Sequence, residues 1–340
     1  MNERPILALT MGDPAGVGAE IIVKTLSKKD YYKMARPVVI GDARRMEQSL
    51  KFVPEKLSIN AIDSVDKAQF TYGVIDVLDI NIEGASVVPY GQVNAIAGKA
   101  AVNYIFKSIE MANNREVDAV VTGPINKESM HLAGFNNYPG HTEIFAEKTN
   151  TKDYAMLLYT NGLYVIHVST HCSLREACDR ANKTRVKKVI ELAYDMVKTY
   201  SIENPRIAVA GLNPHCGENG AFGDEEIREI IPAIEEAQKE GIDVIGPVPP
   251  DSIFYRALKG QFQVVVVMYH DQGHIPVKVI NFDDGVNVTV GLPIIRTSVD
   301  HGTAFGKAGK GTASSASMEA AFKLAADMAS KKWKSEIVKN

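Results

Sequence analysis

The sequence is poor in cysteine, in long apolar runs and in charge of one sign, and each scarcity excludes a class of protein. Only three cysteines occur in 340 residues, too few for a disulfide framework, so we expect a reducing compartment and a cytoplasmic protein. No apolar run approaches the roughly 20 residues of a membrane span, and the N-terminus does not read as a signal peptide. The net charge is −3, which predicts no basic surface for nucleic acid or membranes.

Two nucleotide-binding signatures are also missing. The segment TMGDPAGVGAE (10–20) lacks the G-K-[ST] ending of a phosphate loop, and its glycines at 12, 16 and 18 do not fit G-x-G-x-x-G. What remains is a strand, a tight turn and a helix start. This turn either holds an anion at the helix N-terminus or only carries the chain into the helix.

Apolar runs rich in β-branched residues alternate with amphipathic stretches along most of the chain. Runs such as Val264–Val267, without polar alternation, are typical of strands buried on both faces, so we predict an α/β protein with a mostly parallel sheet. Strands are predicted over 5–11, 37–42, 74–80, 118–123, 155–159, 163–169, 206–212, 263–269 and 286–291. Helices are predicted over 16–28, 97–114, 184–201, 224–241 and 316–334.

The segment HDQGH (270–274) places two histidines four residues apart, as in zinc proteases with H-E-x-x-H on a helix. It follows the strand predicted over 263–269, and Gly273 and Pro276 both oppose helix formation. We therefore predict that His270 stands at a strand end that enters a loop, and that His274 is a loop histidine without a ligand role. Sites in open α/β sheets gather at such strand ends.

Two further histidines share this context. His171 and His215 also follow apolar runs, and with His270 they would supply three imidazoles with an open fourth position, which is the pattern of a catalytic metal site. The alternative for each is an ordinary loop histidine. Cys172 and Cys216 follow two of these histidines, and we interpret them as small buried cysteines rather than ligands.

Basic residues and one glycine-rich segment are further candidates for ligand binding. His141 and Thr142 stand at a turn that opens a helix, and Arg296 follows an apolar run, as suits carboxylate or phosphate binding. The segment DHGTAFGKAGKGTASS (300–315) is either a flexible loop or one whose backbone approaches a ligand closely.

Taken in order, these motifs resemble the 4-hydroxythreonine-4-phosphate dehydrogenase family. The matching stretches are TMGDPAGVGAE, VTGPINKE, GHTE, TH followed by SLR, GLNPHCGE, GPVPPD, MYHDQGHIPVK and GVNVTVGLPIIRTSVDHGTAF, which span residues 10 to about 313. The resemblance implies an isocitrate/isopropylmalate dehydrogenase-like fold, with two three-layer α/β/α domains around a cleft. We expect residues 1–135 plus 308–340 to form the first domain. Residues 136–307 would form the second, which carries most metal and substrate residues and the dimer interface.

The same resemblance implies roles for individual residues. It makes His171, His215 and His270 the ligands of one divalent metal (Zn, Mg, Mn or Co), with His270 supplied by the opposite subunit of a homodimer. It implies NAD or NADP bound at the glycine-rich loop. The implied substrate residues are His141, Thr142, Lys278, Asn287 and Arg296, the implied cofactor residues are Gly302, Thr303, Ala304, Gly309 and Gly311, and the base candidates are Lys278, Asp251 and Asp271.

The segments NGAFGDEE and CSLRE are similar to a branch that acts on D-threonate 4-phosphate or D-erythronate 4-phosphate. On this resemblance the expected reaction is oxidation and decarboxylation to dihydroxyacetone phosphate and CO₂. The alternative is the vitamin B6 branch, which converts 4-phosphohydroxy-L-threonine to 3-amino-2-oxopropyl phosphate. Two interpretations from other classes are a non-catalytic binding protein for phosphorylated sugar acids and a metal hydrolase.

Overall fold

The computed structural model describes residues 4–200, 205–282 and 284–339, and it divides the chain into two compact units. Unit 1 consists of Met1–Thr151 and Leu292–Ser330, and unit 2 of Lys152–Gly291 and Lys331–Asn340. The sequence predicts divisions after residues 135 and 307. With the observed division, the segments that carry His141 and Arg296 belong to unit 1.

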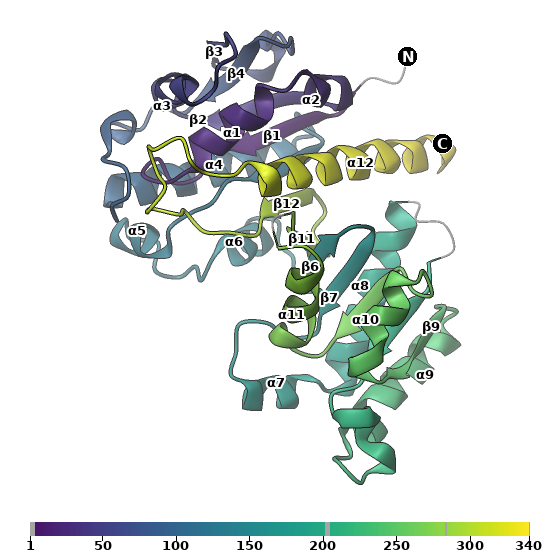
Figure 1. Ribbon diagram of the computed structural model, residues 1–340. Helices are drawn as coiled ribbons and strands as arrows, with labels where there is room; N and C mark the ends of the chain where they lie inside the picture. Colours follow the sequence, from purple (N-terminus) through teal and green to yellow (C-terminus); the bar gives the residue numbers. More distant parts are fainter. Residues whose placement is uncertain (1–3, 201–204, 283, 340) are drawn as a thin grey trace. The chain divides into compact units, whose positions relative to one another are not determined.

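Unit 1 contains six strands in the order β3-β4-β2-β1-β5-β12, and all of the recorded pairings between them are parallel (Figure 1). Its central strands are buried on both faces, as their uninterrupted apolar runs predict. The strands are β1 (Ile6–Thr10), β2 (Arg36–Gly41), β3 (Ser58–Ile62), β4 (Val74–Asp79), β5 (Ala119–Thr122) and β12 (Ile295–Val299). The helices are α1 (Gly18–Leu26), α2 (Lys29–Met34), α3 (Ala43–Ser49), α4 (Ala95–Asn113), α5 (Lys127–Leu132) and α6 (His141–Lys148), with short turns η1 (Leu50–Phe52), η2 (Val65–Lys67) and η3 (Ala85–Val87) and the start of α12 (Ala316–Lys339).

Unit 2 contains six strands in the order β11-β6-β7-β10-β8-β9, with β6 antiparallel to both of its neighbours. The strands are β6 (Ala155–Thr160), β7 (Leu163–His167), β8 (Ile207–Ala210), β9 (Val244–Val248), β10 (Val264–Val267) and β11 (Val286–Val290). The helices are α7 (Leu174–Arg180), α8 (Lys183–Thr199), α9 (Ile231–Lys239), α10 (Pro250–Leu258) and α11 (His270–Ile280), with short elements η4 (Pro214–Asn219) and η5 (Glu226–Ile230).

Helices cover both faces of the unit 2 sheet. Val265 and Val267 of β10 join a core cluster with Ile253 of α10 and Val277 of α11. The alternate residues of β10 point to the opposite face and are equally buried, where α8 packs against the strand. The valine run is therefore hydrophobic throughout because both of its faces lie in the core.

Pairing in unit 2 aligns three strand ends that matter for function. The strands β7, β10 and β8 are parallel neighbours, with His167 opposite Val267 and Val266 opposite Val209. The carboxyl ends of parallel strands meet at one edge of a sheet. The loops that follow these three strands, which carry His171, His270 and His215, therefore leave from the same edge.

The prediction for HDQGH is wrong in one respect. His270 does follow a buried strand closely, but residues 270–280 form the α-helix α11 rather than a loop, with Pro276 inside it. Packing outweighs the intrinsic cost of Gly273 and Pro276, because Gly273, His274 and Val277 are buried against the sheet. His274 is consequently a helix residue, not a loop histidine.

Each predicted strand and helix is present with small shifts in its bounds, and the end of the helix predicted over 184–201 lies outside the described residues. The strands β3, β9 and β12 were not predicted. Among the described residues, none of the helices combines the length and apolar character that crossing a membrane requires.

Candidate active site

The site in unit 2 begins where β7 and β10 end. His171 lies in the loop after β7, and His270 is the first residue of α11, so both project from the carboxyl edge of the sheet. Their ring centroids are 5.9 Å apart. Together with Cys172 and Tyr269 they line a cavity of about 490 Å³, which is large enough for a small-molecule ligand.

The ring of His270 has a carboxylate partner. Its Nδ1 lies 2.6 Å from Oδ1 of Asp271, so in the neutral ring Nδ1–H donates to the carboxylate. This leaves Nε2 as the Lewis-basic nitrogen. Histidines that bind metals are commonly oriented by a carboxylate in this way, so the pair favours a ligand role for His270.

A second pair of histidines stands behind His270. The His274 ring stacks on the His270 ring, with centroids 3.6 Å apart and planes 9° apart. The ring of His167, at the end of β7, lies 4.9 Å from His274 on its other side. Burial lowers the pKa of His274 to about 4 and that of His167 to about 3, so both rings are neutral at pH 7.

Two residues that the sequence analysis did not single out fix the loops of this edge. The buried Gln272 accepts from the Met268 amide at 2.6 Å and donates to the Gly211 carbonyl at 2.7 Å, which ties the start of α11 to the end of β8. The buried Glu226 accepts from the amides of Leu212 and Asn213 at 2.8 and 2.7 Å. Neither has a local signal in the sequence, because each acts on a segment that only the fold brings near.

His215, the third predicted ligand, lies in the turn that Glu226 holds. The turn is strained, since His215, Cys216 and Glu218 all adopt positive φ values. Partial burial raises the pKa of the Cys216 thiol to about 11, so this side chain is neutral at pH 7. Cys172 and Cys216 are both only partly buried, so the prediction of buried cysteines is wrong in that respect. Over the described ranges, no single group of three or more His, Cys, Asp or Glu side chains is arranged to hold a metal ion. The structure thus brings His171 and His270 together without a third ligand beside them.

A different cluster lies in unit 1, at β5, α6 and β12. Arg296 is only 2% exposed, donates to the Thr122 hydroxyl at 2.9 Å and lies over the Phe145 ring at 5.6 Å. His141 is the first residue of α6, and its buried Nε2 has no hydrogen-bond partner. Burial lowers the pKa of His141 well below its usual value, and the Arg296 and Lys127 charges lower it further. A neutral imidazole beside buried positive charge suits an anionic or hydroxylated ligand.

The remaining predicted residues are divided between the units. Thr142 follows His141 on α6, as the expected helix opening requires. In unit 2, Lys278 lies two turns after His270 on α11, and Asp251 is in the first turn of α10. Asn287, on β11, has a buried Oδ1 atom without a hydrogen-bond partner, as expected of a group that meets a ligand.

The chain is similar to known proteins over almost its whole length. Residues 33–325 match the family model described as "Pyridoxal phosphate biosynthetic protein PdxA". The chain is 47% identical to a "Putative D-threonate 4-phosphate dehydrogenase" of Oceanobacillus iheyensis, covering 97% of this chain and 99% of the relative. A Salmonella typhi protein with the same name is 50% identical, covering 96% and 100%. The crystal structure of 4-hydroxythreonine-4-phosphate dehydrogenase from Klebsiella pneumoniae superposes with a TM-score of 0.89 at 45% identity, covering 96% and 99%.

The chain belongs to the PdxA family.

In this PdxA-family chain the glycine-rich loop is held against α1. Glu20 is buried, forms an ion pair of 2.8 Å with Lys24, and accepts from the amide of Ala313 at 2.8 Å. Lys24 donates to the carbonyls of Gly311 and Ala313 at 2.9 and 2.7 Å. These bonds favour a structured loop over a flexible one, and the sequence analysis did not identify either residue.

The turn before α1 is also closed by protein groups. The amide of Val17 donates to the carbonyl of Thr303, and that of Ala15 to Oδ1 of Asp13. This supports the interpretation of TMGDPAGVGAE as a helix-entry turn. Gly302 has open space where a side chain would stand, so a ligand can approach its backbone, whereas Gly309 is required by the Tyr90 ring, 2.7 Å from where its Cβ would lie.

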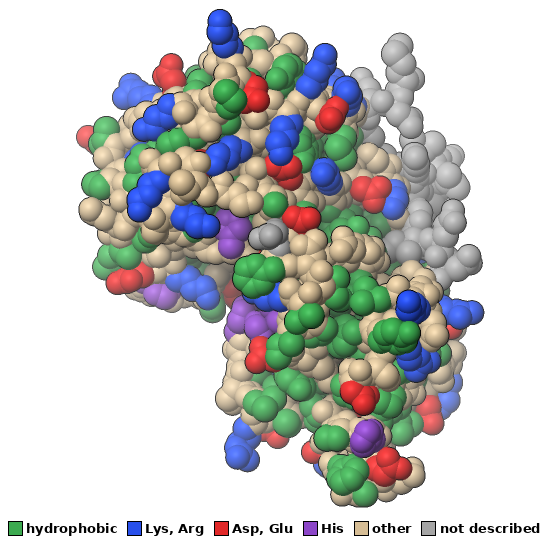
Figure 2. Space-filling view, in the orientation of Figure 1, with side chains coloured by type: hydrophobic (Ala, Val, Ile, Leu, Met, Phe, Trp, Pro, Cys, Tyr) green, Lys and Arg blue, Asp and Glu red, His purple; other side chains and the backbone are tan. Residues whose placement is uncertain are grey.

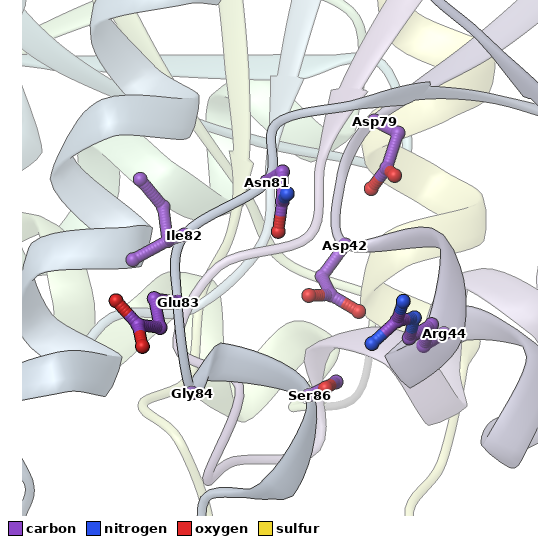
Figure 3. Close-up of a pocket in the computed structure, with 8 residues that line it drawn as sticks. All are labelled: Asp42, Arg44, Asp79, Asn81, Ile82, Glu83, Gly84 and Ser86. Carbon is purple, nitrogen blue, oxygen red and sulfur yellow. The ribbon is translucent and has the colours of Figure 1, made fainter.

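Unit 1 also has a cavity, of about 390 Å³, which opens at the ends of β2 and β4 (Figure 3). Its two strand-end carboxylates have structural roles. Asp42 accepts from the Arg45 amide at 2.8 Å and Asp79 from the Ala43 amide at 2.9 Å, so both satisfy the start of α3.

Proposed function

We propose that the chain is a metal-dependent NAD(P) dehydrogenase that oxidises and decarboxylates D-threonate 4-phosphate, or its epimer D-erythronate 4-phosphate, to dihydroxyacetone phosphate and CO₂. Its family and named relatives make the chain a dehydrogenase that acts on a CH–OH group. We also propose that its fold is of the isocitrate/isopropylmalate dehydrogenase type. The observation that carries it is the position of His171, His215 and His270, which all leave the carboxyl edge of the unit 2 sheet.

The choice of substrate is supported by the relatives. Full-length relatives at 47–50% identity carry the D-threonate 4-phosphate name. A second candidate function, oxidation of 4-phosphohydroxy-L-threonine in vitamin B6 synthesis, is favoured by the family description and by the name of the structural relative. The non-catalytic binding protein and the metal hydrolase both fit less well with relatives that are named dehydrogenases.

The donor set fits a divalent cation that accepts nitrogen ligands. Imidazoles suit zinc or cobalt, and substrate oxygens would extend this to magnesium or manganese. We propose His171, His215 and His270 as the ligands. When bound, the ion would act as a Lewis acid at the C3 oxygen and at the charge that develops on decarboxylation.

The proposed substrate residues are those that the family resemblance implies. We propose His141, Thr142, Lys278, Asn287 and Arg296 as the residues that bind the phosphate and carboxylate of the substrate. When bound, the nicotinamide of NAD⁺ or NADP⁺ would supply a hydride acceptor for C3, and a base of the chain would take up the hydroxyl proton. The β-keto acid would then lose CO₂, and the resulting enolate would take up a proton.

Three residues remain candidates for the base. Asp271 already accepts from the His270 ring, which favours an orienting task over proton transfer. Lys278 lies on the same face of α11 as His270, eight residues on. Asp251, on α10, is the third candidate. For the cofactor we propose the loop that includes Gly302, Thr303, Ala304, Gly309 and Gly311.

We also propose a homodimer in which His270 completes the partner's metal site. Ile275 and Val279 lie four residues apart on α11 and are 60% and 81% exposed, and Phe282, just after the helix, is 74% exposed. Figure 2 shows hydrophobic side chains gathered over α10 and α11. An apolar stripe of this kind on the segment that carries a ligand suits contact with a second copy.

The deciding experiment is a side-by-side assay of three substrates, which are the phosphate esters of D-threonate, D-erythronate and 4-hydroxy-L-threonine. Each is assayed with NAD⁺ and with NADP⁺. We expect NAD(P)H and CO₂ to form from the D-threonate or D-erythronate ester. Removal of metal by a chelator should abolish turnover, and added Co²⁺ or Zn²⁺ should restore it. Preference for the amino substrate would establish the vitamin B6 reaction instead. Absence of any nicotinamide reduction would overturn the dehydrogenase proposal.

The dimer is tested separately with Val279→Glu, which leaves every proposed ligand in place. Light scattering should show a monomer in place of the wild-type dimer, together with weakened Co²⁺ binding. Glu235→Gln on α9, an acidic residue away from this stripe, serves as the control. A Val279→Glu protein that stays dimeric would contradict the assigned interface.

A further inference from the structure

The proposed chemistry leaves His274 without a task, yet it is one of the most constrained side chains of the unit 2 site. It is 7% exposed and lies between two other imidazoles, with centroids 3.6 Å from His270 and 4.9 Å from His167. An apolar side chain would fill this place at a lower desolvation cost. The position of the ring therefore calls for an explanation other than packing.

His270 needs more than its carboxylate to be held in one orientation. Asp271 fixes the Nδ1 edge, but its side chain is 68% exposed and belongs to the neighbouring residue, so the hydrogen bond can move with both side chains. The face of the His270 ring is covered by His274 in a nearly parallel stack. An edge contact and a face contact together restrict both torsions of the ring.

His274 is itself held firmly. Its Nδ1–H donates to the carbonyl oxygen of His270 at 3.0 Å, which fixes the ring against its own helix. On the far side stands His167, which is 1% exposed and donates through Nδ1 to the Met156 carbonyl at 3.2 Å. Gly273 makes this approach feasible, because a Cβ there would lie 2.5 Å from Nε2 of His167.

We propose that His274 is a positioning residue that fixes the imidazole plane of His270 by stacking on it, so that Nε2 of His270 is presented to a divalent cation. The inference rests on the proposed ligand role of His270. Every residue of HDQGH then serves one arrangement. His270 presents its nitrogen, Asp271 fixes its edge, Gln272 ties the helix to β8, Gly273 makes room for His167, and His274 covers the face.

The test uses the full-length protein with Co²⁺ as the probe, since its visible absorption reports the ligand geometry. His274→Ala should raise the Co²⁺ dissociation constant about 10- to 100-fold, the range for loss of an orienting contact to a metal ligand, and should change the absorption spectrum. His274→Phe keeps a flat ring over His270 and should restore affinity to within a few-fold of wild type. His274→Leu keeps volume without a flat ring and should not.

The outcomes separate the inference from its premise. Wild-type Co²⁺ affinity and spectrum in His274→Ala, or equal affinity in the Leu and Phe variants, would overturn the positioning role. If His270→Ala binds Co²⁺ as tightly as wild type, the ligand assignment itself fails. Thermal unfolding of each apo variant detects a folding defect, and His131→Ala, an exposed histidine on α5, controls for loss of a histidine elsewhere.

Discussion

The two clusters, one in each unit, hold histidine in opposite electrostatic settings. In unit 1, His141 is partly buried near the positive charge of Arg296, and the buried Nε2 of the imidazole has no hydrogen-bond partner. In unit 2, His270 is half-exposed, stacked on a neutral imidazole and hydrogen-bonded to a carboxylate. The first setting favours a ligand that brings negative charge or a hydroxyl group. The second makes an imidazole nitrogen available to a cation.

The difference teaches that residue type alone does not assign a histidine. The partner on the second ring nitrogen and the charge of the nearest side chains decide what the first nitrogen can bind. Changes in the unit 2 cluster should therefore affect the metal requirement, and changes in the unit 1 cluster should affect substrate affinity.

The largest effect is expected for His270→Ala. Removing one of three ligands withdraws Lewis-acid stabilisation worth several kcal/mol, so turnover should fall at least about 10³-fold. Metal content after dialysis and the steady-state rate measure the loss. Near-normal activity with an undisturbed metal requirement would contradict the assignment of the metal site to unit 2.

A smaller effect is expected for Arg296→Gln in unit 1. Loss of a charged hydrogen-bond donor to substrate should weaken substrate binding about 10- to 100-fold, while Co²⁺ affinity stays unchanged. The KM for the phosphorylated substrate and a Co²⁺ titration test this. Arg296→Lys keeps the charge and should recover only part of the affinity, because it lacks the planar fork. A change in Co²⁺ affinity would mean that the two clusters are not separable.

The close packing of Gly273 against the sheet predicts that a substitution at this glycine changes the stability of the protein rather than its affinity for substrate. Gly273→Ala forces a methyl group against His167, Val165 and Val267, and overpacking of this kind costs about 1–3 kcal/mol. Denaturant unfolding should show the loss. The double variant with His167→Ala should recover part of it, and no recovery would show that His167 is not the group that is crowded.

The smallest effect concerns Asp13 in unit 1, where burial raises the carboxyl pKa to about 6. The folded state then binds a proton more tightly than the unfolded state, so this group's contribution to stability decreases as the pH rises from about 4 to about 6. Asp13→Asn does not titrate and should gain melting temperature relative to wild type across that range, with a constant difference above it. If the difference in melting temperature between Asp13→Asn and wild type does not change with pH, the pKa of the Asp13 carboxyl group is not raised.

Much of this could be predicted from residue order. Uninterrupted apolar runs identified the central strands, since burial on both faces leaves no polar alternation. The strand-end position of His171, His215 and His270 followed from the same runs. Short or partly polar strands such as β3 and β12 lacked that signal and were not predicted, although β12 carries Arg296.

The sequence by itself determined the α/β class, the order of elements and the set of histidines at one edge of a sheet, because these depend on local hydrophobic patterns. Only the tertiary structure decided that HDQGH is helical, that His274 stacks on His270, and that Gln272 and Glu226 hold the loops. The physical reason is that these outcomes depend on contacts between residues distant in sequence. Burial against the sheet overrides the local preferences of Gly273 and Pro276, and no pattern within the segment records that burial.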